Sequence, residues 1–482
     1  MNKKINIFST FICLICIAGI IAFIYPLSEI IQGDTLWHAK NGEWIIANRK
    51  IPTCDYFSYH EDLSFMAHEW LFDLIIYFVS NGGTVAVYLF AIIFTFLTYS
   101  YVVFRAKSNK QRLFNAIFLL LLTMSGFFKG IMAIPDTIGA VILVAMGNNL
   151  LEKERCFKAK LIINTVLSIV LVNFHGGMMS AAIIQCLFLI GVPCIERFFR
   201  KEKSDFKDTL LILSSFVGSL VNPYCIGIYK YGLMVGTEAS KYISDWVPFS
   251  FTSMLQVFLI SLSIVFAIYG SYIRHKKFYI DIRIWAVFLY IVILCMYKRA
   301  VNLFIYALFL FAGEFILLGL TEFSKKFKYE TVRSFLVTLV SLLCIISSVL
   351  VFGNIKKYPI PNQSIKEYLN DNFVSEKAQE YIKNKRIFNI LDNGGHLIYL
   401  DIPVFIDGRV DPYVPEYGNP DIFMEGYKAL YSDERMLKLS YKYGFTILVL
   451  DANSTSTQIF IASPNWRVID YTQNTIILER TF

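Results

Sequence analysis

The chain has 482 residues, of which 56% are hydrophobic and only 17% are charged, and its mean hydropathy is +0.53. A soluble globular protein has about 25% charged residues, so this composition excludes an ordinary soluble domain and indicates a membrane protein. The formal net charge of +8 is modest, and we attribute it to basic loops on one side of a membrane rather than to nucleic-acid binding.

The first apolar segment, residues 7–27, follows Lys3 and Lys4. It is longer than the apolar core of a signal peptide, which is about 7–15 residues, and no small-x-small cleavage site follows it. We therefore predict a retained membrane anchor. Cys13 and Cys16 lie inside this segment, where packing within an apolar helix is favoured over redox or metal chemistry.

Residues 28–83 are predicted to form a large outer loop with two helices at the membrane interface. The second, "HEWLFDLIIYFVS" (68–80), is apolar but far shorter than the roughly 20 residues that a crossing needs. In the first, "GDTLWHAKNGEWI", Asp34 and His38 are four residues apart and share a helix face. Two interpretations of this stretch remain open. Either Asp34 is a helix N-cap and the two tryptophans are interfacial anchors, or Asp34 is a general base or electrostatic anchor at the mouth of a membrane cavity.

Eleven apolar segments are predicted membrane spans. They lie at 7–27, 84–104, 112–128, 131–150, 160–174, 177–196, 208–222, 252–272, 281–297, 299–320 and 332–353. Basic clusters alternate with loops poor in Lys and Arg, at 105–112, 153–160, 197–207, 274–277 and 325–328. Because positive loops mark the cytoplasmic side, we expect the N-terminus inside and the region after residue 353 outside.

The remaining region, 354–482, is polar and is predicted to be a separate α/β domain outside the membrane. Short strand-like runs ("RIFNIL", "PVFID", "FTILVLD", "QIFIAS", "NTIILER") alternate with helical ones ("SEKAQEYIKN", "MLKLSYKYG"). The sequence "DNGGH" (392–396) is predicted to be a turn between two strands. The fold class predicted for the whole chain is thus an α-helical polytopic membrane domain (1–353) with a C-terminal α/β extracytoplasmic domain.

Polar residues gather at the predicted outer ends of the spans. Acids, imidazoles and a Lys-Arg pair around one outer surface are suited to holding an anionic phosphate and activating a hydroxyl. Any one of them alone is more often a solvated or snorkelling boundary residue, so the prediction depends on the set. The candidate catalytic residues are Asp34, His38 and Glu69, and the candidate substrate-binding residues are Asp136, His175, Asp245, Lys298, Arg299 and Asn302.

The predicted membrane core contains almost no ionisable residue, with Glu314 the main exception. Ion-coupled transporters need buried charges on their pathway, so this distribution argues against a transporter or channel. No Gly-rich phosphate loop, HExxH, GxSxG or Cys/His metal spacing is present. In the tail, Arg409 lies between Asp407 and Asp411, and a self-satisfied ion-pair network is favoured there over a functional loop.

The order of these elements resembles the GT-C superfamily of membrane glycosyltransferases. These proteins combine one span, a large outer loop with an early Asp and two juxtamembrane helices, a polytopic bundle and an exofacial tail. The motifs "GDTLWHAKNGEWI", "HEWL", "NFHGG", "NPYCIGIY", "SDWVP", "KRAVN" and "GGHLIYLDIPVFIDGRVDPY" are similar to the recurrent pattern of a bacterial family of such proteins.

This resemblance implies inverting transfer of a sugar from a polyprenyl-phosphate-linked donor to an extracytoplasmic glycan or lipid acceptor, at a bacterial cytoplasmic membrane. Asp34 matches the first-loop acid that these enzymes use as a base or metal-linked residue, which also allows a divalent cation. The sequence departs from the pattern at Thr35, where mannosyltransferases have a second acid, and at Ile134-Pro135-Asp136, where an Arg-Pro is expected. No WWD-type motif is present, so an envelope polymer or lipid is favoured as acceptor over a protein. The alternative is a non-catalytic scaffold for polysaccharide assembly or export that keeps this shape.

Overall fold

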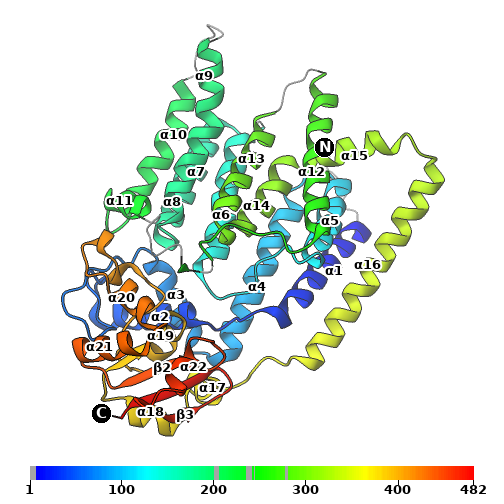
Figure 1. The fold of residues 1–482 in the computed structure, drawn as a ribbon. Coiled ribbons are helices and arrows are strands. Elements are labelled where there is room, and N and C mark those ends of the chain that lie inside the picture. Colours follow the sequence, from blue (N-terminus) through cyan, green and yellow to red (C-terminus); the bar gives the residue numbers. More distant parts are fainter. Residues whose placement is uncertain are drawn as a thin grey trace.

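The computed structural model of the chain describes residues 7–152, 154–199, 206–234, 242–243, 245–276 and 281–481. Long helices form a bundle, and the C-terminal strands and helices gather with α2 and α3 at one end of it (Figure 1). We call this the sheet end and the other the opposite end. The described residues of the predicted basic clusters lie at the opposite end, next to the far ends of helices that reach the sheet end (Figure 1).

Among the described residues, seven helical segments are long and apolar enough to cross a membrane. They are Ile7–Leu27 (α1 with η1), Gly83–Phe104 (α4), Phe157–Phe174 (α7), Met178–Ile195 (α8, η2 and part of α9), Met254–His275 (α12), Lys298–Ser324 (η4, α14, η5 and α15) and Tyr329–Asn354 (within α16, Tyr329–Lys357). Four other predicted spans contain shorter helices, α5 (Asn109–Met124), α6 (Pro135–Leu151), α10 (Phe206–Ser219) and α13 (Ile282–Met296). The predicted polytopic helical fold is confirmed, whereas the number of eleven crossings stays a prediction.

Small residues let neighbouring helices of the bundle approach closely. A Cβ at Gly270 of α12 would lie 2.0 Å from the Phe315 carbonyl oxygen of α15, and one at Gly19 of α1 would lie 2.2 Å from the Ser347 Oγ of α16. Close backbone approach of this kind is how helices pack in lipid, where no hydrophobic force drives them together. The remaining surface of α16 exposes large apolar side chains such as Phe335 and Phe352, as expected of a helix facing lipid.

The loop after α1 carries the two predicted short helices, α2 (Gly33–Asn48) and α3 (Trp70–Ser80). They pack so closely that a Cβ at Gly42 would lie 2.1 Å from the Asp73 carbonyl oxygen. The N-cap of α2 is Gln32, and Asp34 lies inside the first turn, so the N-cap interpretation of Asp34 is wrong. Trp37 is not an interfacial anchor either, because it is buried.

The C-terminal region contains a four-stranded sheet in the order β1-β2-β4-β3. Strands β1 (Ile387–Asn389) and β2 (Ile447–Asp451) are parallel, and β4 (Thr475–Arg480) is antiparallel to both β2 and β3 (Trp466–Tyr471). Helices surround the sheet, at α17 (Ile365–Asn372), α18 (Glu376–Ile382), α19 (Leu391–Tyr399), α20 (Ile422–Ala429), α21 (Asp433–Tyr443) and α22 (Thr457–Ile461).

Three local predictions for this region are wrong. "QIFIAS" is the short helix α22 rather than a strand, and the third strand is instead the following "WRVIDY". "PVFID" forms only a single bridge, between Val404 and Ser58. "DNGGH" begins the helix α19, and its glycines serve close packing, since a Cβ at Gly395 would lie 1.9 Å from the Gly33 carbonyl oxygen.

One buried core runs from the bundle helices into the C-terminal region without a break. It contains Ile76 and Val87 of α3 and α4 together with Ile365, Leu397 and Ile447 of α17, α19 and β2. The predicted boundary at residue 353 falls within α16, and the division into two domains stays a prediction.

Candidate functional site

Side chains from five separate parts of the chain meet at the sheet end of the bundle. They come from α2, the segment before α3, the start of α6, the turn between α7 and α8 and the 3-10 turn η4 (Lys298–Ala300), and the backbone of the C-terminal loop 404–413 lies against them at Gly408. Asp34, His38, Glu69, Asp136, His175 and Arg299 belong to this cluster, which we call the polar cluster.

Asp34 lies in the first turn of α2, beneath the C-terminal loop. The Trp37 indole Nε1 donates a hydrogen bond of 3.0 Å to its carboxylate, and a Cβ at Gly408 would lie 2.3 Å from the same oxygen. Burial raises the pKa of Asp34, and the charge of Asp136 adds to this, while His38 and Arg299 lower it. Asp34 is therefore a partly exposed carboxylate within electrostatic reach of the cluster, held by Trp37 and approached closely by the backbone at Gly408.

His38 is buried against the ring of Trp37, with ring centroids 3.5 Å apart. Its Nδ1 is hydrogen-bonded to the Asp73 carboxylate, whose other oxygen accepts a 2.6 Å bond from the Asn41 amide. Its Nε2 lies 3.5 Å from Glu69 Oε2. A carboxylate on one nitrogen fixes the ring, so His38 presents its second nitrogen toward Glu69.

Glu69 lies at the centre of three imidazoles. Besides His38, the Nδ1 atoms of His175 and His68 lie 3.4 and 3.9 Å from Glu69 Oε1. Burial raises the pKa of Glu69 well above its ordinary value, with Asp136 and Asp73 adding to the shift. Burial also lowers the pKa of both His68 and His175, which favours neutral imidazoles.

Asp136, at the start of α6, joins the imidazoles to the basic residues. Its Oδ1 lies 2.6 Å from His175 Nε2 and accepts a 2.6 Å bond from the Arg299 guanidinium. Its Oδ2 accepts a 3.0 Å bond from Lys129, whose ammonium also lies 3.3 Å from Asp245. The cationic pair of the site is thus Arg299 with Lys129.

Three predicted residues are placed at the edge of the polar cluster or away from it. Lys298 is exposed, and none of the described residues pairs with its ammonium. Asp245 has a side chain that is 44% exposed and pairs with Lys129 at the rim. Asn302 is buried in α14, and its amide oxygen has no partner among the described residues. Their predicted part in substrate binding stays a prediction.

The predicted site residues do not include Asp73, Lys129 or His68, although His68 and Lys129 are among the polar residues at the predicted outer ends of the spans. Asp73 follows Glu69 by four residues, a spacing that places both side chains on one side of a helical turn. This spacing could have identified Asp73 as a neighbour of Glu69. Lys129 precedes Asp136 by seven residues across a loop, and no periodicity joins them. His68 was visible only as the neighbour of Glu69.

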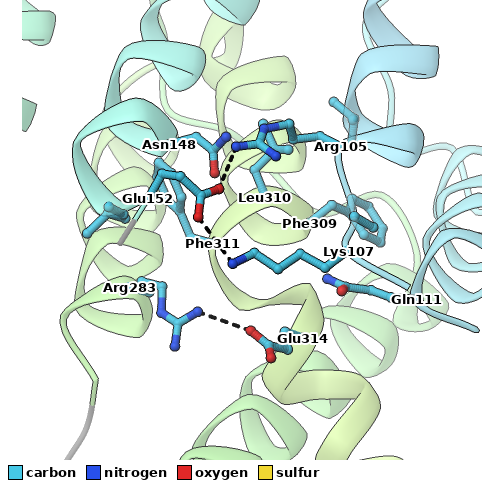
Figure 2. Close-up of a pocket in the computed structure, with 13 residues that line it drawn as sticks. Arg105, Lys107, Gln111, Asn148, Glu152, Arg283, Phe309, Leu310, Phe311 and Glu314 are labelled. Carbon is cyan, nitrogen blue, oxygen red and sulfur yellow. Dashed lines mark hydrogen bonds and ion pairs between the residues drawn. The ribbon is translucent and has the colours of Figure 1, made fainter. Parts of the chain in front are cut away.

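One cavity of the structure lies away from Asp34. Its volume is about 70 Å³, and it lies near the opposite end between Arg105, Lys107, Glu152, Arg283 and Glu314 (Figure 2). Glu152 binds Arg105 and Lys107, and Glu314 binds Arg283, so the charges of this cavity are satisfied within the protein. Asp34 is instead covered by the backbone at Gly408, and a substrate would need this loop to withdraw.

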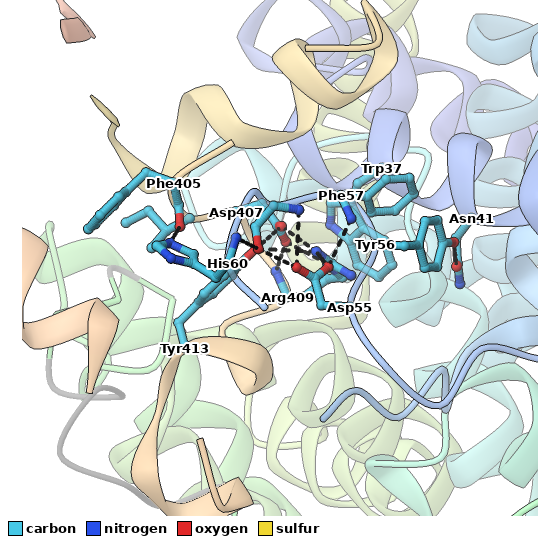
Figure 3. Close-up of polar contacts among 12 residues, drawn as sticks. Trp37, Asn41, Asp55, Tyr56, Phe57, His60, Phe405, Asp407, Arg409 and Tyr413 are labelled. Atoms are coloured by element: carbon cyan, nitrogen blue, oxygen red, sulfur yellow. Dashed lines mark hydrogen bonds and ion pairs between the residues drawn. The ribbon is translucent and has the colours of Figure 1, made fainter. Parts of the chain in front are cut away.

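A second buried network fastens the C-terminal loop over the first loop (Figure 3). The Arg409 guanidinium donates to Asp407 at 2.6 and 2.8 Å and to Asp55 at 2.5 Å, and all three side chains are at most 1% exposed. The Tyr413 hydroxyl donates to Asp407 at 2.5 Å. Arg409 and Asp407 therefore form the expected self-satisfied network, but its second acid is Asp55 of the first loop, whereas Asp411 interacts with Tyr231.

No protein-family model matches this sequence, and no curated protein sequence matches it. Solved structures do share its fold. The apo oligosaccharyltransferase of Archaeoglobus fulgidus superposes with a TM-score of 0.58 at 10% identity, over 94% of this chain and 70% of that one. ArnT of Cupriavidus metallidurans in the apo state superposes with a TM-score of 0.52 at 11% identity, over 97% of both chains. The same protein bound to undecaprenyl phosphate superposes with a TM-score of 0.50 at 10% identity, over 99% of this chain and 98% of that one. Both proteins are GT-C glycosyltransferases, so the chain has the GT-C fold.

Proposed function

We propose that this protein transfers a sugar, with inversion, from a polyprenyl-phosphate-linked donor to a lipid or cell-envelope glycan on the outer side of a bacterial cytoplasmic membrane. The observation that carries the proposal is the convergence of a half-buried acid, Asp34, and a cationic pair, Arg299 and Lys129, around Asp136 at one end of a GT-C bundle. A shared fold does not by itself imply a shared activity, so the proposal is based on the residues of the polar cluster.

The neighbours support the class of donor. The ArnT structure is bound to undecaprenyl phosphate, and another structure of the A. fulgidus oligosaccharyltransferase contains a dolichol-phosphate with an inhibitory peptide. Both ligands are polyprenyl phosphates, which pair a membrane-embedded chain with an anionic head. A site with a partly exposed guanidinium, that of Arg299, beside membrane helices suits such a molecule.

In the proposed reaction the acceptor hydroxyl attacks the anomeric carbon on the face opposite the phosphate, and the bond from that carbon to the phosphate oxygen breaks. Asp34 takes the hydroxyl proton. A raised pKa makes its carboxylate a stronger base than an ordinary aspartate, provided that it is ionised. His38 and Glu69 flank it and hold the polar surroundings of the acceptor.

Arg299 takes the charge that develops on the departing phosphate. One of its terminal nitrogens is bound to Asp136, and its side chain remains 30% exposed, so other N–H groups of the guanidinium are free to reach a ligand. The Asp136 carboxylate holds the guanidinium in place, and Lys129 adds a second positive charge nearby. Charge placed in advance where the phosphate leaves lowers the barrier without reorganisation.

The experiment is mass spectrometry of lipid-linked sugars and envelope glycans from cells with and without the gene. We expect one polyprenyl-linked sugar to accumulate in the deletion strain and one glycan or lipid modification to disappear. Wild type and Asp401→Asn should restore the profile, because Asp401 is an exposed acid paired with Lys40, whereas Asp34→Asn should not. Restoration by Asp34→Asn would support the scaffold alternative and overturn the catalytic role.

A further inference from the structure

His68, Glu69 and His175 form a compact group of potential metal ligands. One ligand atom from each lies within 4.8 Å of the other two. The three side chains are 12%, 11% and 8% exposed, so the group is shielded from bulk water. The Nδ1 atoms of His68 and His175 are both buried and have no hydrogen-bond partner among the described residues. An unpaired buried nitrogen is costly, and here two of them face the same carboxylate oxygen.

The tautomer of His175 follows from its other contact. Its Nε2 lies 2.6 Å from Asp136 Oδ1, and since a carboxylate only accepts, this nitrogen carries the hydrogen. In the neutral ring Nδ1 then presents a lone pair, and that lone pair lies 3.4 Å from Glu69 Oε1. A lone pair opposite an ionised carboxylate oxygen is repulsive unless a proton or a metal cation lies between them, and a metal cation serves both imidazoles at once. His68 Nδ1 lies 3.9 Å from the same Glu69 oxygen.

The spacing of these atoms suits a transition-metal ion. Zinc binds nitrogen and oxygen at about 2.0–2.1 Å, and in a tetrahedron this places neighbouring ligand atoms about 3.3–3.4 Å apart. The distance from His175 Nδ1 to Glu69 Oε1 matches this value, whereas His68 Nδ1 lies about half an ångström too far from the same oxygen and must move toward the ion. Two imidazoles and one carboxylate favour zinc or a similar ion over magnesium or calcium, which take mostly oxygen ligands.

The two segments that carry the ligands are held together before any ion binds. The Gly176 N–H donates to the His68 carbonyl at 3.2 Å, and the Trp70 indole donates to Asn173 at 2.9 Å. The Tyr231 ring lies against the His68 imidazole, with centroids 4.2 Å apart. The Asp136 carboxylate orients His175 from behind, as carboxylates commonly do for metal-binding histidines. The motifs "HEWL" and "NFHGG" therefore meet as one preorganised unit.

We propose that His68 Nδ1, Glu69 Oε1 and His175 Nδ1 bind a zinc-class divalent ion, with a fourth position open beside the polar cluster. The bound ion pins the start of α3 to the turn between α7 and α8 and offsets the buried charge of Glu69. The ion shares Glu69 and His175 with the polar cluster, but its test is independent of the sugar-transfer proposal, because zinc occupancy is measured without any donor or acceptor.

The test is metal analysis of the full-length protein in lipid nanodiscs, purified with a tag that lacks histidine. The protein is stripped with a chelator, its thiols are alkylated so that exposed cysteines do not bind metal, and it is reloaded with ZnCl₂. We expect one equivalent of zinc by mass spectrometry in wild type. His68→Gln, Glu69→Gln and His175→Gln should each lose it. His275→Gln is the matched control, since His275 lies at the opposite end beside Asp281, and it should keep the zinc.

Two further measurements guard against variants that do not fold. Cobalt loaded into wild type should give visible d–d bands of a nitrogen- and oxygen-bound ion without thiolate charge transfer. Zinc should also raise the Tm of wild type and of His275→Gln but not of the three ligand variants, whereas MgCl₂ should raise none of them. Wild type that retains no zinc, or equal zinc in wild type and all three ligand variants, would overturn the proposal.

Discussion

Arg299 and Lys298 are adjacent in η4, yet their side chains have different surroundings. The Arg299 guanidinium is bound to Asp136, and the Lys298 ammonium is exposed. We predict that Arg299→Gln raises the KM for the lipid-linked donor by at least about tenfold, which is about 1.4 kcal/mol of lost phosphate binding. Lys298→Gln should change it by less than about twofold. Asp136 keeps Lys129 and His175 as partners in either variant, so the fold is retained.

Steady-state kinetics with increasing donor measures this difference. Arg299→Lys is the informative control, since it keeps the charge but loses the planar fork, and partial recovery is expected. Equal effects of Arg299→Gln and Lys298→Gln would contradict the assignment of the phosphate to Arg299.

Asp411 of the C-terminal loop predicts a pH dependence of stability. Burial raises its pKa from 3.8 to about 7, although the Tyr231 hydroxyl and Arg409 lower it part of the way back. Between these values the folded protein holds a proton that the unfolded chain has released, so this group's contribution to stability falls as pH rises from about 4 to about 7. The upper bound is about 4 kcal/mol.

Asp411→Asn should remove this loss, because the amide stays neutral at every pH. We expect thermal unfolding in detergent to give a variant that gains stability over wild type from pH 5 to about pH 7, after which the difference levels off. Asp401→Asn, at an exposed acid, should follow the wild-type curve. A constant difference between Asp411→Asn and wild type across this range would show that Asp411 does not titrate there.

Some residues of the site were accessible to sequence reasoning, and others were not. Asp34, His38 and Glu69 stand out because acids and imidazoles are rare in a chain this apolar and lie in short helical motifs. The pairing of Asp136 with Arg299 joins positions 163 residues apart, and no local pattern encodes such a contact. The burial of Trp37 against His38 was missed because the C-terminal loop that covers it is more than 360 residues away.

At the scale of elements, the buried Arg409 network joins the first loop to the C-terminal loop that covers Asp34 (Figure 3). Asp55 also accepts hydrogen bonds from the backbone of Phe57 and Ser58, so the first loop is shaped around this carboxylate. Removing one partner of a buried ion pair leaves uncompensated charge and costs about 3–5 kcal/mol. Arg409→Met should therefore lower the Tm strongly and free the C-terminal loop.

Limited proteolysis reports on the loop, and we expect faster cleavage within 404–413 in Arg409→Met. Arg467→Met is the control, because Arg467 is 66% exposed and its pairing with Glu479 contributes little. If Arg409→Met unfolds and is cleaved as wild type does, the network does not fasten the loop.

The helices were more predictable than the small elements around the sheet. Every predicted span contains a helix because apolar length is a strong signal in lipid. "QIFIAS" and "WRVIDY" are both short and rich in β-branched or aromatic residues, and strand pairing with β4 decides between them. "DNGGH" resembles a turn by composition, but its glycines are required by the contact with Gly33.

At the scale of the whole molecule, the basic clusters predict which end of the bundle faces the cytoplasm. Cys54, in the first loop at the sheet end, and Cys156, before α7 at the opposite end, are both exposed. In single-cysteine variants of intact cells, a membrane-impermeant maleimide should label Cys54 directly. It should label Cys156 only after the membrane is permeabilised, since the charged reagent does not cross lipid.

Cells lysed before labelling provide the control, and both cysteines should then react to a similar extent. Labelling of Cys156 but not Cys54 in intact cells would invert the orientation and place the polar cluster on the cytoplasmic side.

Release of polyprenyl phosphate by the purified protein tests the proposed enzyme most directly. Lipids extracted from the deletion strain, in which the donor accumulates, are incorporated into nanodiscs with wild type or Asp34→Asn, and the released carrier is measured by mass spectrometry. Wild type should release it in step with acceptor modification, and Asp34→Asn should be slower by at least about 100-fold, the scale expected for loss of a general base. Equal release by the two proteins would contradict the assignment of Asp34 and, with it, the proposed site.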